Sequence, residues 1–141
     1  MKLSARNTFR GTVTNIIIGA VNVEVTITLK GGVPLVAVVT NGAIAHLSLE
    51  VGSEAVAIIM ASSIIIGTDL HCSSVSARNI FCGTIAQIIE GPVNTEVDVE
   101  IGGGNTISAV ITHGSSEKLG LKSGGHACAM FKASSVIIGM S

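Results

Sequence analysis

Aromatic residues are nearly missing from this chain of 141 residues, which has no Trp, no Tyr and only three phenylalanines, Phe9, Phe81 and Phe131. Hydrophobic residues still make up 48% of the sequence, so the core has to be built from Val, Ile, Leu and Ala. Charged residues are scarce as well, at 12%, about half the usual share. So little charge on a small protein indicates that much of its surface faces another subunit rather than water.

The sequence also lacks a basic patch and a long apolar run. Its net charge is −1 and no stretch clusters Lys or Arg, which excludes the wide positive footprint of a nucleic-acid-binding surface. Lys2 is followed by polar residues, without the apolar segment of a signal peptide. The longest apolar stretch, residues 55–67, is interrupted by Ser62 and Ser63 and is shorter than the roughly 20 residues of a membrane-spanning helix. We therefore expect a soluble, cytoplasmic protein.

Cysteine is infrequent, with three residues at Cys72, Cys82 and Cys128. Their number is odd and they form no Cys-x-x-Cys pair. Free thiols in a reducing cytosol are the expectation, and a redox or metal-binding role is the alternative.

The tetrapeptide Ser-Ala-Arg-Asn occurs twice, at residues 4–7 and 76–79. An offset of 72 (78 − 6) aligns residues 4–67 with 76–139 without a gap, and roughly half of the aligned residues are identical. This predicts a tandem duplication with a first unit at 1–67, a linker at 68–75 and a second unit at 76–141. Each unit is too small to bury a large core alone, which favours an oligomer.

Each unit has the pattern of a β-rich domain. Val23, Val25 and Ile27 alternate with polar residues, and the second unit repeats this alternation, as expected for half-buried strands. Glycines follow as hairpin turns, and a third strand comes next. The next segment breaks the alternation and predicts a short helix with Asn41 as N-cap and Gly52 at its end. Five strands with a helix between the third and fourth predict an all-β fold of tandem five-stranded OB-like barrels.

Hydrogen-bond donors occur at the same places in both units. Arg6 and Arg78 each follow a serine by two residues, so in an extended chain the two side chains point to one side. Both units also close on a pair of serines, and a threonine ends each third strand. Such donors suit a small tetrahedral oxyanion, which offers only acceptors. The alternative is that the arginines bond to loop carbonyls and the serines satisfy buried backbone groups.

A second duplicated segment is Gly-Ala-Val-Asn at residues 19–22, which matches Gly-Pro-Val-Asn at 91–94. Turn formation explains both. The alternative is a second anion cradle made by backbone N–H groups and the Asn amide. Glu24 and Glu96 follow these turns and would repel an anion, so we expect them to be solvated or paired with arginine.

No catalytic arrangement is shared by the two units. His46, His71, His113 and His126 have no histidine at the equivalent position, so we expect them to be surface residues. Ser/His/Asp, Cys/His and paired-carboxylate arrangements do not recur, and the glycine run at 102–104 lacks the strand–helix context of a nucleotide-binding loop. The sequence does not predict an enzyme.

Taken together, Ser-Ala-Arg-Asn, Gly-x-Val-Asn-x-Glu-Val, a strand ending in Val-Thr or Ile-Thr and the closing Lys-Ala-Ser-Ser resemble the molybdate-binding Mop-type domain. Two such domains in tandem resemble the di-domain molbindins, and the resemblance covers residues 4–139. It implies OB-like barrels, a cytoplasmic store or buffer for molybdate and often tungstate, and a homotrimer. It also implies that oxyanions lie at contacts between units and are held by hydrogen bonds, without a cofactor or a direct protein–metal bond.

Carried onto this sequence, the resemblance implies two classes of oxyanion site. The first class comprises Ser4, Ala5, Arg6, Asn7, Thr40, Ala61, Ser62, Ser76, Ala77, Arg78, Asn79, Thr112, Ser115, Lys132, Ala133 and Ser134. The second class, nearer the three-fold axis, comprises Gly19, Ala20, Val21, Asn22, Gly91, Pro92, Val93 and Asn94. The expected partners are a small oxyanion and further copies of the chain, and neither nucleic acid nor a membrane.

The two units differ at donor positions. Met60 replaces the equivalent of Lys132, Ala43 replaces the equivalent of Ser115, and Pro92 removes a backbone N–H. A charge-assisted hydrogen bond contributes roughly 1.5–3 kcal/mol, so losing the lysine would weaken a site by roughly ten- to hundredfold. We therefore expect unequal sites, of which those built around Lys132 are the stronger.

Two other functions remain as alternatives. OB-like folds bind nucleic acid, but this requires stacking aromatics and a basic groove, and the three phenylalanines have the positions of core residues. A purely structural oligomer is the second alternative, and the duplicated donor clusters argue against it.

Overall fold

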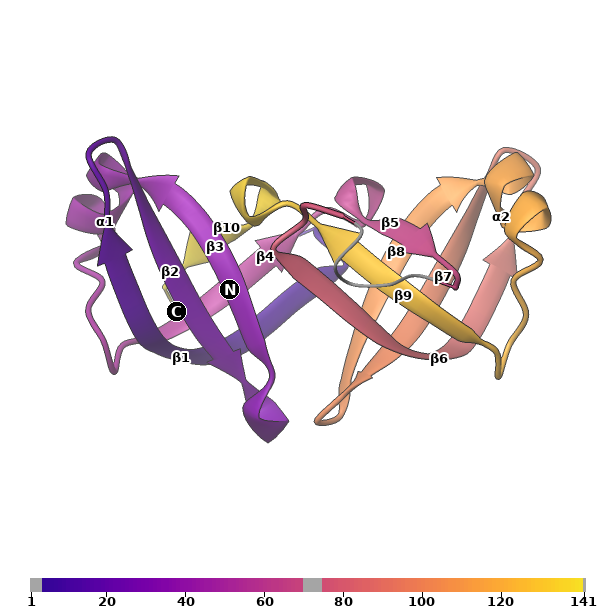
Figure 1. Ribbon diagram of the computed structural model, residues 1–141, viewed down its shortest axis with the longest axis horizontal. Helices are drawn as coiled ribbons and strands as arrows, with labels where there is room; N and C mark the ends of the chain where they lie inside the picture. Colours follow the sequence, from indigo (N-terminus) through magenta and orange to yellow (C-terminus); the bar gives the residue numbers. More distant parts are fainter. Residues whose placement is uncertain (1–3, 70–74, 141) are drawn as a thin grey trace.

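The computed structural model describes residues 4–69 and 75–140, which form two similar halves (Figure 1). The strands and helices of the first sequence unit are β1 (Asn7–Ile18), β2 (Asn22–Leu29), η1 (Lys30–Gly32), β3 (Pro34–Thr40), α1 (Asn41–Leu47), β4 (Glu54–Ile59), η2 (Ala61–Ser63) and β5 (Ile65–Gly67). Those of the second unit are β6 (Asn79–Glu90), β7 (Asn94–Gly102), β8 (Asn105–Thr112), α2 (His113–Leu119), β9 (His126–Phe131), η4 (Ala133–Ser135) and β10 (Ile137–Gly139). The expected linker lies partly outside the described residues, as do His71 and Cys72.

The halves exchange their last strands. One antiparallel sheet has the order β10-β4-β1-β2-β3 and the other β5-β9-β6-β7-β8. In Figure 1 the yellow β10 accordingly lies among the indigo and magenta strands. We call the first sheet with α1 the first half, and the second sheet with α2 the second half; neither coincides with the sequence units 1–67 and 76–141.

Both sheets curl towards a closed barrel. The edge strands β10 and β3 of the first half contact each other, as do β5 and β8 of the second. The long first strand of each half has a register shift, between Val13 and Asn15 in β1 and between Ile85 and Gln87 in β6. Such bulges bend a strand and let it pair with a different neighbour at each end. The expected OB-like fold is confirmed.

The alternation in β2 predicts its orientation correctly. Val23, Val25 and Ile27 are buried, whereas the polar residues between them are half-exposed. The core is mainly Val, Ile, Leu and Ala, and Phe9 and Phe131 are also buried in it. Phe81 packs against this core and its ring centroid lies 5.9 Å from that of Phe131.

The short helices begin one residue earlier than expected. Thr40, not Asn41, is the N-cap of α1, because its hydroxyl accepts a hydrogen bond from the Ala43 N–H at 3.1 Å. The helix ends at Leu47, followed by Ser48 in the left-handed conformation, and does not extend to Gly52. No helix in the part of the chain that the structure describes has the length and hydrophobicity needed to cross a membrane.

The asparagine of each Ser-Ala-Arg-Asn joins the two halves. Asn7 donates its amide hydrogen to the Ser108 carbonyl and accepts from the Ser108 N–H, both at 2.8 Å. Asn79 makes the equivalent pair of bonds with Val36, at 2.7 and 2.8 Å. Both asparagines are at most 2% exposed. Each therefore extends hydrogen bonding from the first strand of one half to the third strand of the other.

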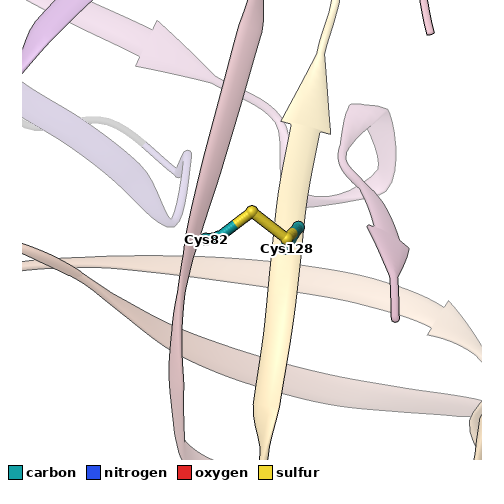
Figure 2. The surroundings of a disulfide bond; sticks show 2 residues. All are labelled: Cys82 and Cys128. Atoms are coloured by element: carbon teal, nitrogen blue, oxygen red, sulfur yellow. A yellow bond between two sulfur atoms is a disulfide. The ribbon is translucent and has the colours of Figure 1, made fainter. Parts of the chain in front are cut away.

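The expectation of free thiols is wrong for two of the three cysteines. Figure 2 shows the disulfide between Cys82 on β6 and Cys128 on β9. The two strands are antiparallel and their register places these residues directly opposite each other, so the side chains meet. The two partners are 46 residues apart, so they form no Cys-x-x-Cys pair that the sequence could reveal. In the first half, Arg10 and Val56 form the equivalent pair.

Candidate functional site

Strand register gathers the donors of the second half at one end of its sheet. Asn79 pairs with Phe131, so the residues just before β6 and just after β9 leave the sheet side by side. They line a pocket of about 640 Å³ that also includes Val38 of the first half. We call it the Lys132 pocket. Its side-chain donors are Ser63, Ser76, Arg78, Lys132, Ser134 and Ser135, and no carboxylate is among the residues that line it.

The same register operates in the first half. Asn7 on β1 pairs with Ile59 on β4. Arg6, just before β1, and Met60, just after β4, therefore lie next to each other across the two strands at the end of the sheet. We call this place the Met60 site. Its hydroxyl side chains are those of Ser4 and Ser62, both exposed. The arrangement repeats that of the Lys132 pocket, with a thioether in place of the ammonium group.

Each arginine forms an ion pair with a glutamate of the opposite half. Arg6 lies 3.0 Å from Glu96 on β7, and Arg78 pairs with Glu24 on β2. The glutamate side chains are 12% and 22% exposed, whereas those of the arginines are 63% and 55% exposed. The expected pairing of these glutamates with arginine is therefore confirmed. Each guanidinium group is thus paired with a carboxylate, while the arginine side chain remains more than half exposed.

The two ion pairs have different surroundings. Burial raises the pKa of Glu96 above its ordinary value of 4.5, and the nearby Asp98 raises it further, whereas Arg6 lowers it. Thr26 on β2 takes the place of Asp98 in the first half. The Arg6 ion pair thus carries an additional acidic neighbour that the Arg78 ion pair lacks.

A second pocket, of about 620 Å³, lies where η2 meets β8 and α2. We call it the Lys118 pocket, after the one charged residue among those that line it. Thr112, Ser115 and Ser62 supply hydroxyl groups, and Asn94 supplies an amide. Thr112 accepts from the Ser115 N–H at 3.1 Å and donates its hydroxyl hydrogen to the Ser115 hydroxyl at 2.8 Å. The Ser115 hydroxyl hydrogen is then directed to another acceptor.

Two residues expected to bind the oxyanion are used elsewhere. Asn7 and Asn79 are buried and bonded to the backbone of the other half, so the structure places them beneath the donor clusters and not in a pocket. The remaining first-class residues of the second unit fall into the two pockets: Ser76, Ala77, Arg78, Lys132, Ala133 and Ser134 in one, Thr112 and Ser115 in the other. Of the first-unit residues, Ser62 lines the Lys118 pocket; Ala5 is half-buried, Ala61 is buried and Thr40 is exposed.

The second-class residues, 19–22 and 91–94, form the β1–β2 and β6–β7 turns at opposite ends of the molecule (Figure 1). Val21 and Val93 are 74% and 71% exposed. The Gly19 N–H donates to the Asn22 carbonyl at 2.9 Å, so it is used inside the turn. A single chain therefore does not bring the two turns together.

Lys118, Ser63 and Ser135 line the two pockets but are not among the site residues that the sequence predicts, and Lys118 is the only charged one of the three. The position of Lys118 carried a signal, because Thr112, Ser115 and Lys118 are spaced three apart and therefore lie on one face of a helix whose N-cap is Thr112. The signal was hidden because His46 occupies the equivalent position of the first unit.

Comparison with known proteins finds the same domain in both sequence units. The family model described as the TOBE domain matches residues 3–66 and again residues 75–138. The solved structure of the cytoplasmic molybdate-binding protein ModG, with molybdate bound, superposes with a TM-score of 0.94 and 45% sequence identity, covering 100% of both chains.

Two curated relatives have similar identity. The molybdenum-pterin-binding protein MopA of Rhodobacter capsulatus is 43% identical over 99% of this chain and 53% of its own length. The molybdenum transport protein ModE of Azotobacter vinelandii is 41% identical over 98% of this chain and 51% of its own length. The chain thus spans about half the length of these relatives. The resemblance to tandem Mop-type domains is confirmed, and the chain belongs to the TOBE domain family, whose domain it carries twice.

Proposed function

We propose that this chain binds molybdate through hydrogen bonds in pockets between its two halves, and that it stores or buffers this anion in the cytoplasm. The observation that carries the proposal is the Lys132 pocket, in which Ser76, Arg78, Lys132 and Ser134 converge without a carboxylate among the lining residues. The molybdate-bound ModG structure, which matches over the whole chain, supports the choice of anion.

The chemistry of the donors favours a fully deprotonated tetrahedral dianion. Molybdate offers only acceptors, and Lys132 supplies a positive charge beside the exposed side chain of Arg78, which is also paired with Glu24. Phosphate keeps a proton near neutral pH and would bring a donor to a site made of donors, which disfavours it. Tungstate has the same shape and charge as molybdate, so we propose that it is bound as well.

We further propose that the chain acts as a homotrimer. Ile18, Val21 and Val93 are more than 70% exposed at the two outer turns of a chain that has little charge to keep such surfaces in water. Trimer formation would cover these residues and bring the second-class turns of different chains together. The turn residues would then complete anion sites that one chain lacks.

The experiment is equilibrium dialysis of the purified chain against molybdate, tungstate, sulfate and phosphate, with bound molybdenum and tungsten measured by elemental analysis and bound sulfate and phosphate measured by radioactive labelling. Native mass spectrometry of the same samples gives the oligomeric state. We expect several molybdate or tungstate ions per trimer and little sulfate or phosphate. Lys132→Ala should reduce molybdate binding, whereas Lys122→Ala, at an exposed loop position away from both pockets, should not. Equal uptake of all four anions, or uptake of none, would contradict the proposal.

A further inference from the structure

The exchange of the last strands regroups the donors of the two sequence units. Segment η4, which follows Lys132, packs against β3 of the first half, and η2, which follows Met60, packs against β8 of the second half. Helix α1 begins directly after β3, and α2 directly after β8. The segment that lacks the lysine therefore lies next to the start of α2, and the segment that has it lies next to the start of α1.

Lys118 lines the pocket to which η2, the segment that follows Met60, contributes. Ser62 of η2 lines the Lys118 pocket together with Thr112, Ser115 and Lys118. These last three residues share a helix face because they are spaced three apart. Val110, which also lines this pocket, is the repeat equivalent of Val38, which lines the Lys132 pocket.

The loss of a donor from one closing segment is matched by a gain of donors on the helix next to it. Where the closing segment has Met60, the facing helix has Ser115 and Lys118. Where the closing segment has Lys132, the helix of the facing half has Ala43 and His46 at the equivalent positions. Each combination of closing segment and helix thus contains one lysine, and the combination without the motif lysine gains the extra hydroxyl.

The electrostatic surroundings leave the Lys118 ammonium group available to an anion. Within residues 4–69 and 75–140, Lys118 makes no salt bridge, although its neighbour Glu117 is an acid. Glu117 is instead bonded to His113 at 3.0 Å, one helical turn earlier. Arg6, by contrast, is already paired with Glu96. Ser62 belongs to the Met60 site and also lines the Lys118 pocket, so Ser62 is the residue that connects the Met60 site with Lys118.

We propose that Lys118 is the cationic anion-binding residue of the Met60 site and replaces there the motif lysine that the first sequence unit lacks. This inference rests on the proposed function, since it names a further residue for the same anion. It revises the expected inequality of the sites, because that expectation assigned Lys118 to no site. The Met60 site gains from α2 an ammonium group and a serine hydroxyl.

The test is isothermal titration calorimetry with molybdate on the wild-type protein, Lys118→Ala, Lys132→Ala and the double variant. We expect Lys118→Ala to weaken one set of sites by roughly ten- to hundredfold and to leave the other set unchanged. Lys132→Ala should weaken the other set, and the double variant should weaken both. Adding Met60→Lys to Lys118→Ala should restore the lost set, because it returns a lysine to the same site.

Lys122→Ala, at an exposed position in the loop after α2, is the matched control and should titrate like the wild type. An unchanged isotherm for Lys118→Ala, or an equal loss in Lys122→Ala, would overturn the inference while the proposed function stands. Failure of Met60→Lys to restore binding would also overturn it, since Lys118 would then act at another place. A wild-type protein that binds no molybdate would refute the proposed function itself, and Lys118 with it.

Discussion

The two halves of this molecule have the same backbone but different chemistry at a few equivalent positions. The bulges, helix caps and cross-half asparagine bonds occur in both. The second half alone has a disulfide, the acidic neighbour Asp98 and the motif lysine Lys132. Duplication thus preserves the residues that hold the halves together, whereas charge and redox chemistry have diverged around the donor clusters.

This comparison separates two roles within one motif. In Ser-Ala-Arg-Asn the asparagine is buried and bonded to the other half, whereas the serine and the arginine remain exposed at the donor cluster. The motif occurs twice because each half needs the other half's asparagine to complete its barrel edge. Because the asparagine bonds to the other half, the serine and the arginine of the same tetrapeptide lie at the junction between the halves.

The largest effect is expected when the shared bonds are broken. Asn7→Ala and Asn79→Ala each leave a backbone N–H and a carbonyl without their partner at a buried position, which should lower the free energy of unfolding by about 2–4 kcal/mol. Chemical denaturation measures this. The two variants should lose similar amounts, because the bonds are equivalent.

Asn15→Ala is the control for these variants, since Asn15 is exposed on β1 and should tolerate the change. A loss confined to one of the two buried asparagines would show that the halves are not joined symmetrically. Unchanged stability in both variants would contradict the role assigned to this residue of the motif.

A smaller effect should distinguish the halves. Reducing the bond between Cys82 and Cys128 with a dithiol should lower the free energy of unfolding by about 2–4 kcal/mol, through the second half alone. The single variant Cys128→Val, which copies Val56 of the first half, should show this lower stability with or without reductant. A thiol assay on the denatured, unreduced protein should detect one free thiol; detection of three would contradict the disulfide.

The smallest effect concerns pH. Because the pKa of Glu96 is raised, the folded state binds more protons than the unfolded state, and stability falls as pH rises from about 4.5 through the raised pKa. Asp98→Thr, which copies Thr26, removes one cause of the rise and should increase stability at neutral pH by less than about 1 kcal/mol. The gain should vanish below the unfolded pKa of Glu96, where its carboxyl group is protonated in both the folded and the unfolded state. Thermal unfolding from pH 3.5 to 7.5 measures it, and a gain that is independent of pH would refute the electrostatic cause.

Much of the fold could be predicted from the sequence, because the patterns that indicate strands are local and each occurs in both sequence units. The alternation of Val23, Val25 and Ile27 predicts a strand and its buried face, and the gapless repeat predicts a second copy of each element. The exchange of β5 and β10 was not accessible, because nothing in a three-residue strand specifies which of two similar sheets it joins.

The candidate site was accessible only in part for the same reason. Serine, arginine and lysine donors could be recognised as duplicated motifs, but the grouping of Ser62 with Thr112 and Lys118 depends on that exchange. The disulfide depends on the register between β6 and β9, which the sequence does not display. The sequence did not indicate that Asn7 is buried, because a polar residue next to an arginine is typical of an exposed binding segment.

The central claim is that the anion sites are composed of segments from both halves of the chain. Anomalous diffraction at the molybdenum edge, from crystals grown with molybdate, tests it most directly because it locates the metal without a model of the ligand. We predict molybdenum peaks between Arg78 and Lys132 and between Ser62 and Lys118. Peaks confined to the outer turns at residues 19–21 and 91–93, with both pockets empty, would contradict it.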